Sequence, residues 1–353
     1  MKSKLLLLAA FSLTLLHSCA NPGISPGTNP GPARLNQSAA QPNRMAAQRP
    51  RLTRVEQLVE RERMEKNLAS LSGKIAFAPG TIIPERGTVK GRAMTRAFLT
   101  SYLEALGYKV ELHEYRKNGI NVTARLLAEE PTDEYIVVGA HMDSVSNAGA
   151  DDNGSGSTAV LEAATLLPQL AGRKVNILFA WFDEEELGLI GSGYLARSLK
   201  KQGMKISSMH NVDMLGWDGD KDRTVELARP DGVLWDYYQM VNQTHGLKLP
   251  LERTNTGQSD HVSFRNEGYS SIMLSEEYTT RDSTPYYHRR GDTFETINFD
   301  FLASSTRLMI AAVGDLSMKV PPPPNIQLVP HDRFPARERH FHKSYEEAAA
   351  HLD

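Results

Sequence analysis

Apolar residues recur along the chain with two spacings, one typical of helices and one typical of strands. Helical spacing is found at residues 55–70, 91–106, 154–170, 187–201 and 299–318. Strand-like runs are found at residues 108–115, 120–127, 135–139, 175–182, 207–212 and 271–275. Because strands and helices alternate, the pattern predicts an α/β fold in three layers, with a mixed, largely parallel sheet between helices. The first two strand runs are neighbours in sequence and predict an antiparallel edge.

The N-terminal end departs from this pattern and is typical of an export signal. Lys2 and Lys4 precede an apolar run at residues 5–16 that is too short to span a membrane. Leu16-His17-Ser18-Cys19 then resembles a bacterial lipobox, which predicts a lipoprotein signal peptide over residues 1–19 and acylation of Cys19. We expect the protein in the Gram-negative cell envelope, anchored by lipid in the outer membrane. An ordinary signal cleaved near Ala20 is the alternative and would leave the protein secreted or periplasmic.

The rest of the chain divides into a tether, one folded domain and a tail. Residues 20–50 are rich in Pro, Gly, Asn, Gln and Ser and hold too few large apolar side chains to fold. We expect the folded domain at residues 51–318 and a Pro-rich, charged tail at residues 319–353. Cys19 is the only cysteine, so a disulfide within the chain is impossible.

Composition narrows the class of partner. Of the 353 residues, 40% are hydrophobic, which is typical of a globular protein. The 40 basic and 42 acidic residues give a formal net charge of −2, so no basic field favours nucleic acid as a partner. We expect contact with a membrane only through the lipid anchor.

Five residues with metal-binding side chains stand in distinctive short contexts. They are His141, Asp152, Glu186, Asp213 and His288. Three of the five, His141, Glu186 and Asp213, come shortly after predicted strands, and sites in open α/β sheets form at the carboxyl ends of strands. Three carboxylates and two imidazoles suit a borderline-soft divalent metal, and they are enough for two ions that share one carboxylate. The set predicts a metal-dependent hydrolase.

Two further acids support this chemistry. Four acids at residues 183–186 follow a buried strand, which is costly unless cations lie nearby. Glu185 and Glu186 can divide the work, one moving protons and the other binding metal. Asp143 stands two residues after His141 and is predicted to orient its imidazole.

Each of these residues also has a simpler interpretation. His141 alone could be an ordinary hydrogen-bonded histidine at a strand end. In the acidic, glycine-rich stretch 151–156, Asn153 or Ser155 could cap a helix without excluding metal binding by Asp152. The same stretch does not fit a phosphate loop, because no lysine follows it. The run Ser259-Asp260-His261 holds the residue types of a serine triad, but consecutive residues cannot easily form one and the chain has no Gly-x-Ser-x-Gly elbow.

Taken in order, these segments resemble the M28 family of zinc peptidases, from about His141 to Thr296, with weaker support at residues 71–106. The resemblance implies two zinc ions bridged by Asp152, with Glu185 as general base and acid. It also implies that Tyr287 stabilises the oxyanion.

The resemblance extends to the substrate side of the site. It implies that the segment 259–264 lines the site, and it predicts Gln258, Asp260 and His261 as substrate-binding residues. Gln258 departs from the family, since some members have an arginine just before the Ser-Asp-His run and use it to organise the substrate's amine end.

The function predicted on this basis is a dizinc aminopeptidase that removes N-terminal residues from peptides. A glutaminyl cyclase with one zinc on the same fold is one alternative, and a related carboxypeptidase or dipeptidase is another. A catalytically dead binding module is a third, but the complete ligand set and Glu185 argue against it.

Overall fold

The computed structural model describes residues 52–230, 232–279 and 282–320. The predicted signal peptide, Cys19, the tether and nearly all of the C-terminal tail therefore lie outside the described residues. Within the described residues, no helix combines the length and apolar character needed to cross a membrane.

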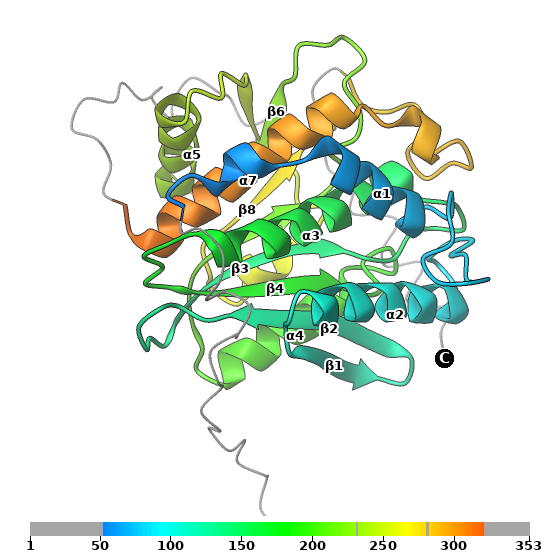
Figure 1. Cartoon of the computed structure of the whole chain (residues 1–353), viewed down its shortest axis with the longest axis horizontal. Helices are drawn as coiled ribbons and strands as arrows, with labels where there is room; N and C mark the ends of the chain where they lie inside the picture. Colours follow the sequence, from blue (N-terminus) through cyan, green and yellow to red (C-terminus); the bar gives the residue numbers. More distant parts are fainter. Residues whose placement is uncertain (1–51, 231, 280–281, 321–353) are drawn as a thin grey trace, which may run out of the picture. The chain divides into compact units, whose positions relative to one another are not determined.

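One sheet of eight strands organises the described part of the chain (Figure 1). The strands are β1 (Val110–Arg116), β2 (Gly119–Leu126), β3 (Glu134–His141), β4 (Asn176–Phe182), β5 (Lys205–Val212), β6 (Val225–Ala228), β7 (Leu251–Thr254) and β8 (Ser271–Ser275). They lie in the order β1-β2-β4-β3-β5-β8-β6-β7. The four central strands β4, β3, β5 and β8 are parallel, whereas β1, β2 and β4 pair antiparallel at one edge. The predicted mixed sheet and its antiparallel edge are confirmed.

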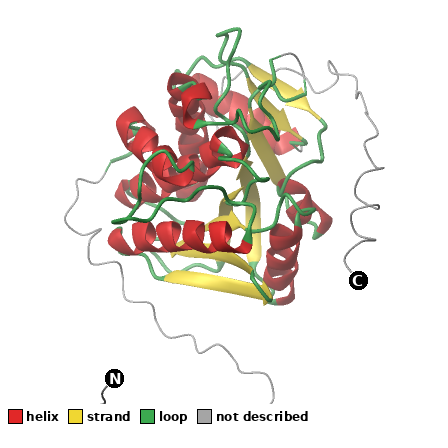
Figure 2. Ribbon diagram, turned by 90° about the vertical axis from the view of Figure 1, so that its right-hand side faces the viewer, coloured by secondary structure: helices red, strands yellow, loops and turns green. Residues whose placement is uncertain are grey.

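Helices cover both faces of this sheet (Figure 2). They are α1 (Arg61–Leu71), α2 (Val89–Ala105), α3 (Gly156–Leu166), α4 (Ile190–Lys201), α5 (Gly232–Thr244), α6 (His261–Asn266) and α7 (Phe299–Met318), with short 3-10 turns such as η2 (Val55–Leu58). Side chains at two of the N-termini explain where the helices begin. The hydroxyl of Thr88 accepts a hydrogen bond from the Gly91 amide before α2, and Asn298 accepts one from the Phe301 amide before α7.

Strand β4 shows why the fold needs a layer on each side. All seven of its residues are buried, and successive side chains of a strand point to opposite faces. Ile177 and Trp181 accordingly pack in the larger core with α1, α2, α3, α5 and α7, whereas Leu178 and Phe182 pack in the smaller core with α4 and α6. The apolar run therefore predicts a strand covered on both faces, as the structure shows.

The predicted elements agree with the observed ones to within a few residues, except at two places. The helix expected at residues 55–70 is divided into η2 and α1, and β6, α5, β7 and α6 were not predicted. Strands β6 and β7 have four residues each, too few to show an alternating pattern.

Candidate metal centre and pocket

The backbone brings the five predicted ligands to one edge of the sheet. His141 is the last residue of β3, and Asp213 directly follows β5. Glu186 lies four residues after β4, and Asp152 lies in the turn before α3. Because β3, β4 and β5 are parallel neighbours, their carboxyl ends meet at this edge. His288 joins them from the long segment that follows β8.

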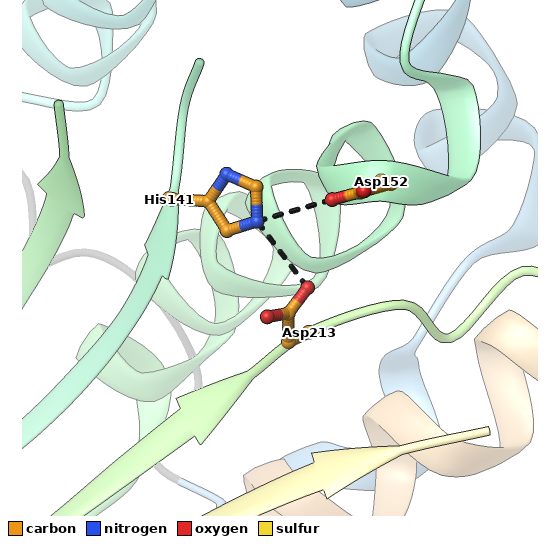
Figure 3. A group of neighbouring side chains, drawn as sticks. All are labelled: His141, Asp152 and Asp213. Carbon is orange, nitrogen blue, oxygen red and sulfur yellow. Dashed lines mark ion pairs between the residues drawn. The ribbon is translucent and has the colours of Figure 1, made fainter. Parts of the chain in front are cut away.

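Three of the five side chains converge around one imidazole nitrogen (Figure 3). His141 Nε2 lies 3.2 Å from Asp152 Oδ1 and 3.3 Å from Asp213 Oδ1. All three residues are buried. A single N–H cannot point well at both oxygens, so the arrangement suits a cation at their centre.

The second group shares Asp152 with the first. His288 Nε2 lies 3.1 Å from Asp152 Oδ2 and 3.0 Å from Glu186 Oε2. In each group, one ligand atom from each residue lies within 4.8 Å of the others. The two oxygens of Asp152 therefore face different groups. The side chain of His288 is 41% exposed, which places this second group at the open side.

The donor set fits zinc. Among the described residues, the buried oxygens Glu186 Oε1 and Asp213 Oδ1 accept no well-formed hydrogen bond, and Asp213 Oδ1 has only the His141 nitrogen at 3.3 Å. Buried carboxylate oxygens without partners are costly unless a cation compensates them. Nitrogen and oxygen donors at this spacing are the ligands that zinc takes in catalytic sites.

The charges in the cluster shift the pKa values of its side chains. Burial opposes the ionisation of Asp152, but hydrogen bonds from His141 and His288 outweigh it and lower the pKa of Asp152. Burial and the negative charge of Asp152 raise the pKa of Glu186 to about 7. Burial also opposes the charging of His288, yet its bonds to Asp152 and Glu186 raise its pKa to about 10. The carboxylates of the cluster therefore favour a positively charged partner beside them.

A pocket opens at the cluster. It is lined by His141, Asp152, Glu185, Asp213, Met214, Thr256, Gln258, Met273, Ser275, Tyr278, Tyr287 and His288. Glu185 is the one residue of the acidic run 183–186 in this lining. Burial raises the pKa of Glu185 well above its usual range, His141 opposes the rise, and the carboxylates of Asp260 and Asp213 add to it.

The acidic run after β4 divides into two pairs with different partners. Asp183 and Glu184 turn away from the pocket toward arginines: Arg92 Nε lies 2.8 Å from Asp183 Oδ1, and Arg92 Nη2 lies 3.0 Å from Glu184 Oε1. Arg116 Nε lies 2.8 Å from Glu184 Oε2. Glu185 and Glu186 remain for the site. A run of four acids after a buried strand predicts nearby cations. For Asp183 and Glu184 these cations are arginines.

Asp143 lies beside His141, as the sequence predicts, and it also contacts the backbone of Glu185 and Glu186. Its carboxylate Oδ1 lies 3.5 Å from His141 Nδ1, and its backbone oxygen lies 3.2 Å from the same nitrogen. Its two carboxylate oxygens also accept hydrogen bonds from the backbone amides of Glu185 and Glu186, at 3.1 and 3.2 Å. One side chain therefore connects His141 to the acidic pair.

The turn before α3 also contains a helix-capping hydrogen bond. It is made by Asn153 and not by the predicted ligand Asp152. Asn153 Oδ1 accepts a hydrogen bond of 2.8 Å from the amide of Gly156, the first residue of α3. Its side-chain amide donates to the carbonyl of Val212, the last residue of β5. Asn153 thus joins the turn to β5, while Asp152 faces the site.

The predicted substrate-binding residues do not all reach the pocket. Gln258 lines it, but Asp260 and His261 are fully buried and are not among the lining residues. Because α6 begins at His261, both side chains lie inside the protein, and their contact with substrate stays a prediction.

The hydrogen bonds of this segment also exclude a serine triad. Ser259 Oγ donates to Asp213 Oδ2 at 2.5 Å, whereas His261 Nε2 contacts the carbonyl of Thr256. Ser259 thus orients a predicted metal ligand.

Tyr278 lines the pocket beside Gln258 and Tyr287 and was not predicted. Tyr278 donates a hydrogen bond of 3.1 Å to Gln258 Oε1 and packs edge-on against Tyr287. Tyr287 in turn stacks on His288, with 3.8 Å between ring centroids. No local motif distinguishes Tyr278, and only the tertiary fold brings it to the pocket.

Comparisons with known proteins agree with this geometry. A model of peptidase family M28 matches residues 121–313. The chain belongs to this family. A leucine aminopeptidase 1 from Trichophyton rubrum is 29% identical over 284 residues, 73% of this chain and 74% of the relative. A probable leucine aminopeptidase from Arthroderma otae is 29% identical over 230 residues, and the match spans only 60% of that relative's length. The predicted M28 membership is confirmed.

Solved structures show the same M28 fold. The LapA aminopeptidase of Legionella pneumophila has a TM-score of 0.66 at 22% identity, covering 75% of this chain and 74% of its own. BSAP, a zinc aminopeptidase from Bacillus subtilis, is 29% identical with a TM-score of 0.52, covering 56% of this chain and 50% of its own. A glutaminyl cyclase from Porphyromonas gingivalis has a TM-score of 0.60 at 19% identity, and the match covers 73% of this chain and 98% of the cyclase. At such identity, the likeness to the cyclase and to LapA shows the fold alone.

Proposed function

We propose that this M28 peptidase is an aminopeptidase that uses two zinc ions to remove N-terminal residues from peptides. The observation that carries the proposal is the pair of ligand groups that share Asp152 beside the acid Glu185. His141 and Asp213 would complete one zinc site, and Glu186 and His288 the other. The zinc aminopeptidase BSAP and the leucine aminopeptidases among the relatives support this choice.

The chemistry divides between the metals and the side chains. Zinc, when bound, lowers the pKa of water and polarises a peptide carbonyl. Glu185 lines the pocket without belonging to either ligand group, so it is free to act as the base. It takes a proton from the attacking water and returns it to the departing amine. Tyr287, which also lines the pocket, donates a hydrogen bond to the oxygen on which charge develops.

The pocket also suits a substrate with a free amine. Its acids favour an ammonium group, whereas Met214 and Met273 offer apolar surface to the first side chain. We therefore expect leucyl arylamides to be cleaved and N-acetyl-leucyl arylamides to be poor substrates. Leaving a desolvated carboxylate unpaired makes blocking of the amine cost about 2–4 kcal/mol of transition-state stabilisation.

A comparison of kcat/KM on this substrate pair tests the proposal. Equal rates on free and blocked substrates would remove the aminopeptidase assignment. Ring closure of an N-terminal glutamine without release of an amino acid would establish a cyclase instead. Release of C-terminal residues from the same peptides would indicate a carboxypeptidase.

We further propose that the enzyme works in the cell envelope, held by lipid on Cys19. The support is the sequence alone: an apolar run ending in a lipobox-like Leu16-His17-Ser18-Cys19. Lipoprotein processing adds more than one acyl chain, and stable anchoring needs more than one. Cys19→Ser should abolish incorporation of labelled fatty acid and release the protein from membranes. Unchanged membrane fractionation of that variant would contradict the anchor.

A further inference from the structure

Arg86 is a completely buried arginine beside the metal centre, and it comes from outside the segment that the family model matches. It lies between α1 and α2, is 0% exposed and is among the largest fully buried side chains of the protein. The matched segment begins only at residue 121. An arginine is almost never buried in full unless its charge and donors are satisfied.

Most of the donors of Arg86 go to backbone carbonyls of the loop at residues 142–151, which follows β3. Nε donates to Met142 O at 2.9 Å, Nη1 to Ala148 O at 2.5 Å, and Nη2 to Gly149 O at 2.6 Å. Nη1 also donates to Leu71 O at 3.1 Å, at the end of α1. The loop begins directly after His141 and ends just before Asp152. A rigid, planar set of donors thus fixes the chain between two predicted zinc ligands.

The loop closes so tightly around the guanidinium that only glycine fits at its end. Gly149 has a φ of +56°, and a Cβ placed there would lie 2.7 Å from Arg86 Nη2 and 2.6 Å from Asp152 O. The amide of Gly154 donates back to Gly149 O at 2.9 Å. The backbone of the Asp152 turn and the guanidinium therefore share one carbonyl.

The charge of Arg86 also acts on the site. Burial lowers the pKa of Arg86, and the carboxylates of Asp292, Asp152 and Asp143 oppose this, because their negative charge favours the guanidinium. Asp292 accepts hydrogen bonds from the amides of Asp151 and Asp152, at 2.7 and 3.1 Å. Arg86 and Asp292 therefore hold the backbone of the same turn.

We propose that Arg86 is a positioning residue of the metal centre, which sets the spacing of His141 and Asp152 by holding the loop between them. This inference rests on the proposed zinc-dependent function. Since Asp152 belongs to both ligand groups, a displaced loop should weaken the binding of both ions. A purely structural arginine would instead affect stability without affecting metal affinity.

The chain offers a matched control in Arg173. It is also buried, at 7% exposed, and it also donates to backbone carbonyls, those of Leu167, Pro168 and Leu170. It precedes β4 and therefore lies at the end of the sheet opposite the site. The experiment compares Arg86→Met, Arg86→Lys, Arg173→Met and Arg173→Lys in the otherwise native protein. Zinc affinity is measured by competition with a chelator, and unfolding by temperature.

We expect Arg86→Met to bind zinc about 10–100-fold more weakly than the native protein, as when other residues that support metal ligands are removed. Arg86→Lys keeps the charge but has a single nitrogen that cannot reach carbonyls on several sides, so its zinc affinity should also fall. Arg173→Met should unfold at a lower temperature and keep the native zinc affinity.

Native zinc affinity in folded Arg86→Met would overturn the proposal. If Arg86→Met does not fold, the lysine pair decides, and equal zinc affinity in Arg86→Lys and Arg173→Lys would overturn it. The native protein is measured alongside. Failure of the native protein to bind zinc would instead refute the proposed function itself.

Discussion

Two groups among the described residues bring imidazole and carboxylate side chains together inside the fold, and they arrange these side chains differently. One is the site around Asp152. The other, here named the helix clamp, consists of Glu56 on η2, His245 just after α5 and Asp315 on α7. In the helix clamp, His245 Nδ1 lies 3.0 Å from Glu56 Oε1, and Nε2 lies 3.0 Å from Asp315 Oδ2.

The difference lies in how the ring nitrogens are used. In the helix clamp, each nitrogen of His245 has an acceptor of its own, so a doubly protonated ring satisfies the group. In the site, one nitrogen of His141 faces oxygens of two carboxylates, which a single proton cannot satisfy. The same residue types thus favour a proton where the acceptors are on opposite sides of a ring and a metal where they converge.

The energetic consequences should differ as well. Arg54 adds to the helix clamp by donating from Nε to Glu56 Oε1 and from Nη2 to the carbonyl of His245. This group joins the first described turn of the chain to α5 and α7. None of its members lines the pocket. Its loss should therefore lower stability, whereas a change in the site should lower activity.

The largest expected effect is on turnover. Glu185→Gln removes the base but neither ligand group, so kcat should fall about 10²–10⁴-fold, the usual contribution of general acid–base help. Zinc content, measured by elemental analysis, should stay close to two equivalents. Glu186→Gln is the matched variant and should lose zinc affinity as well as activity. Native turnover by Glu185→Gln would show that the base is another residue.

Three of the five candidate ligands could be located from the sequence because they follow strands that are themselves easily recognised. His141, Glu186 and Asp213 each come after an apolar run, and parallel strands deliver their ends to one edge. Asp152 lies in a glycine-rich turn that opens a helix. Local sequence and sheet topology thus determine most of the site together.

Arg86 could not be found in this way. Its acceptors are backbone carbonyls, which any residue supplies, so they leave no pattern in the side chains around it. The burial of Asp260 and His261 was missed for a related reason. The resemblance places their segment at the site, but the start of α6 at His261 decides which side chains face the pocket, and Ser259 reaches Asp213 instead.

The helix clamp predicts a second, smaller effect, on stability alone. His245→Gln leaves Asp315 without its imidazole partner, whereas Glu56 keeps Arg54. Breaking a fully buried pair typically costs about 3–5 kcal/mol, and we expect a loss toward the lower end because Arg54 remains. Chemical denaturation should show this loss, while kcat and zinc content should stay native. His113→Gln is the control, because its ring contacts the amide of Asn121 rather than carboxylates. A stability loss in His113→Gln as large as that in His245→Gln would contradict the assignment.

The smallest expected effect is the dependence of the free energy of unfolding on pH, to which His245 of the helix clamp contributes. Burial opposes the charging of His245, but its bonds to Asp315 and Glu56 win and raise its pKa from 6.5 to about 9. The folded state therefore holds an extra proton between these values. The stabilisation is complete below pH 6.5 and is lost as pH rises through about 9.

Within that window, the free energy of unfolding should fall by at most about 1.4 kcal/mol per pH unit because of His245. The measurement is the difference between the native protein and His245→Gln in denaturation series from pH 6 to about 10. This difference cancels the titration of the site, which both proteins share. Parallel curves across the window would mean that His245 is neutral in the folded protein. The helix clamp would then be held by ordinary hydrogen bonds instead of a buried proton.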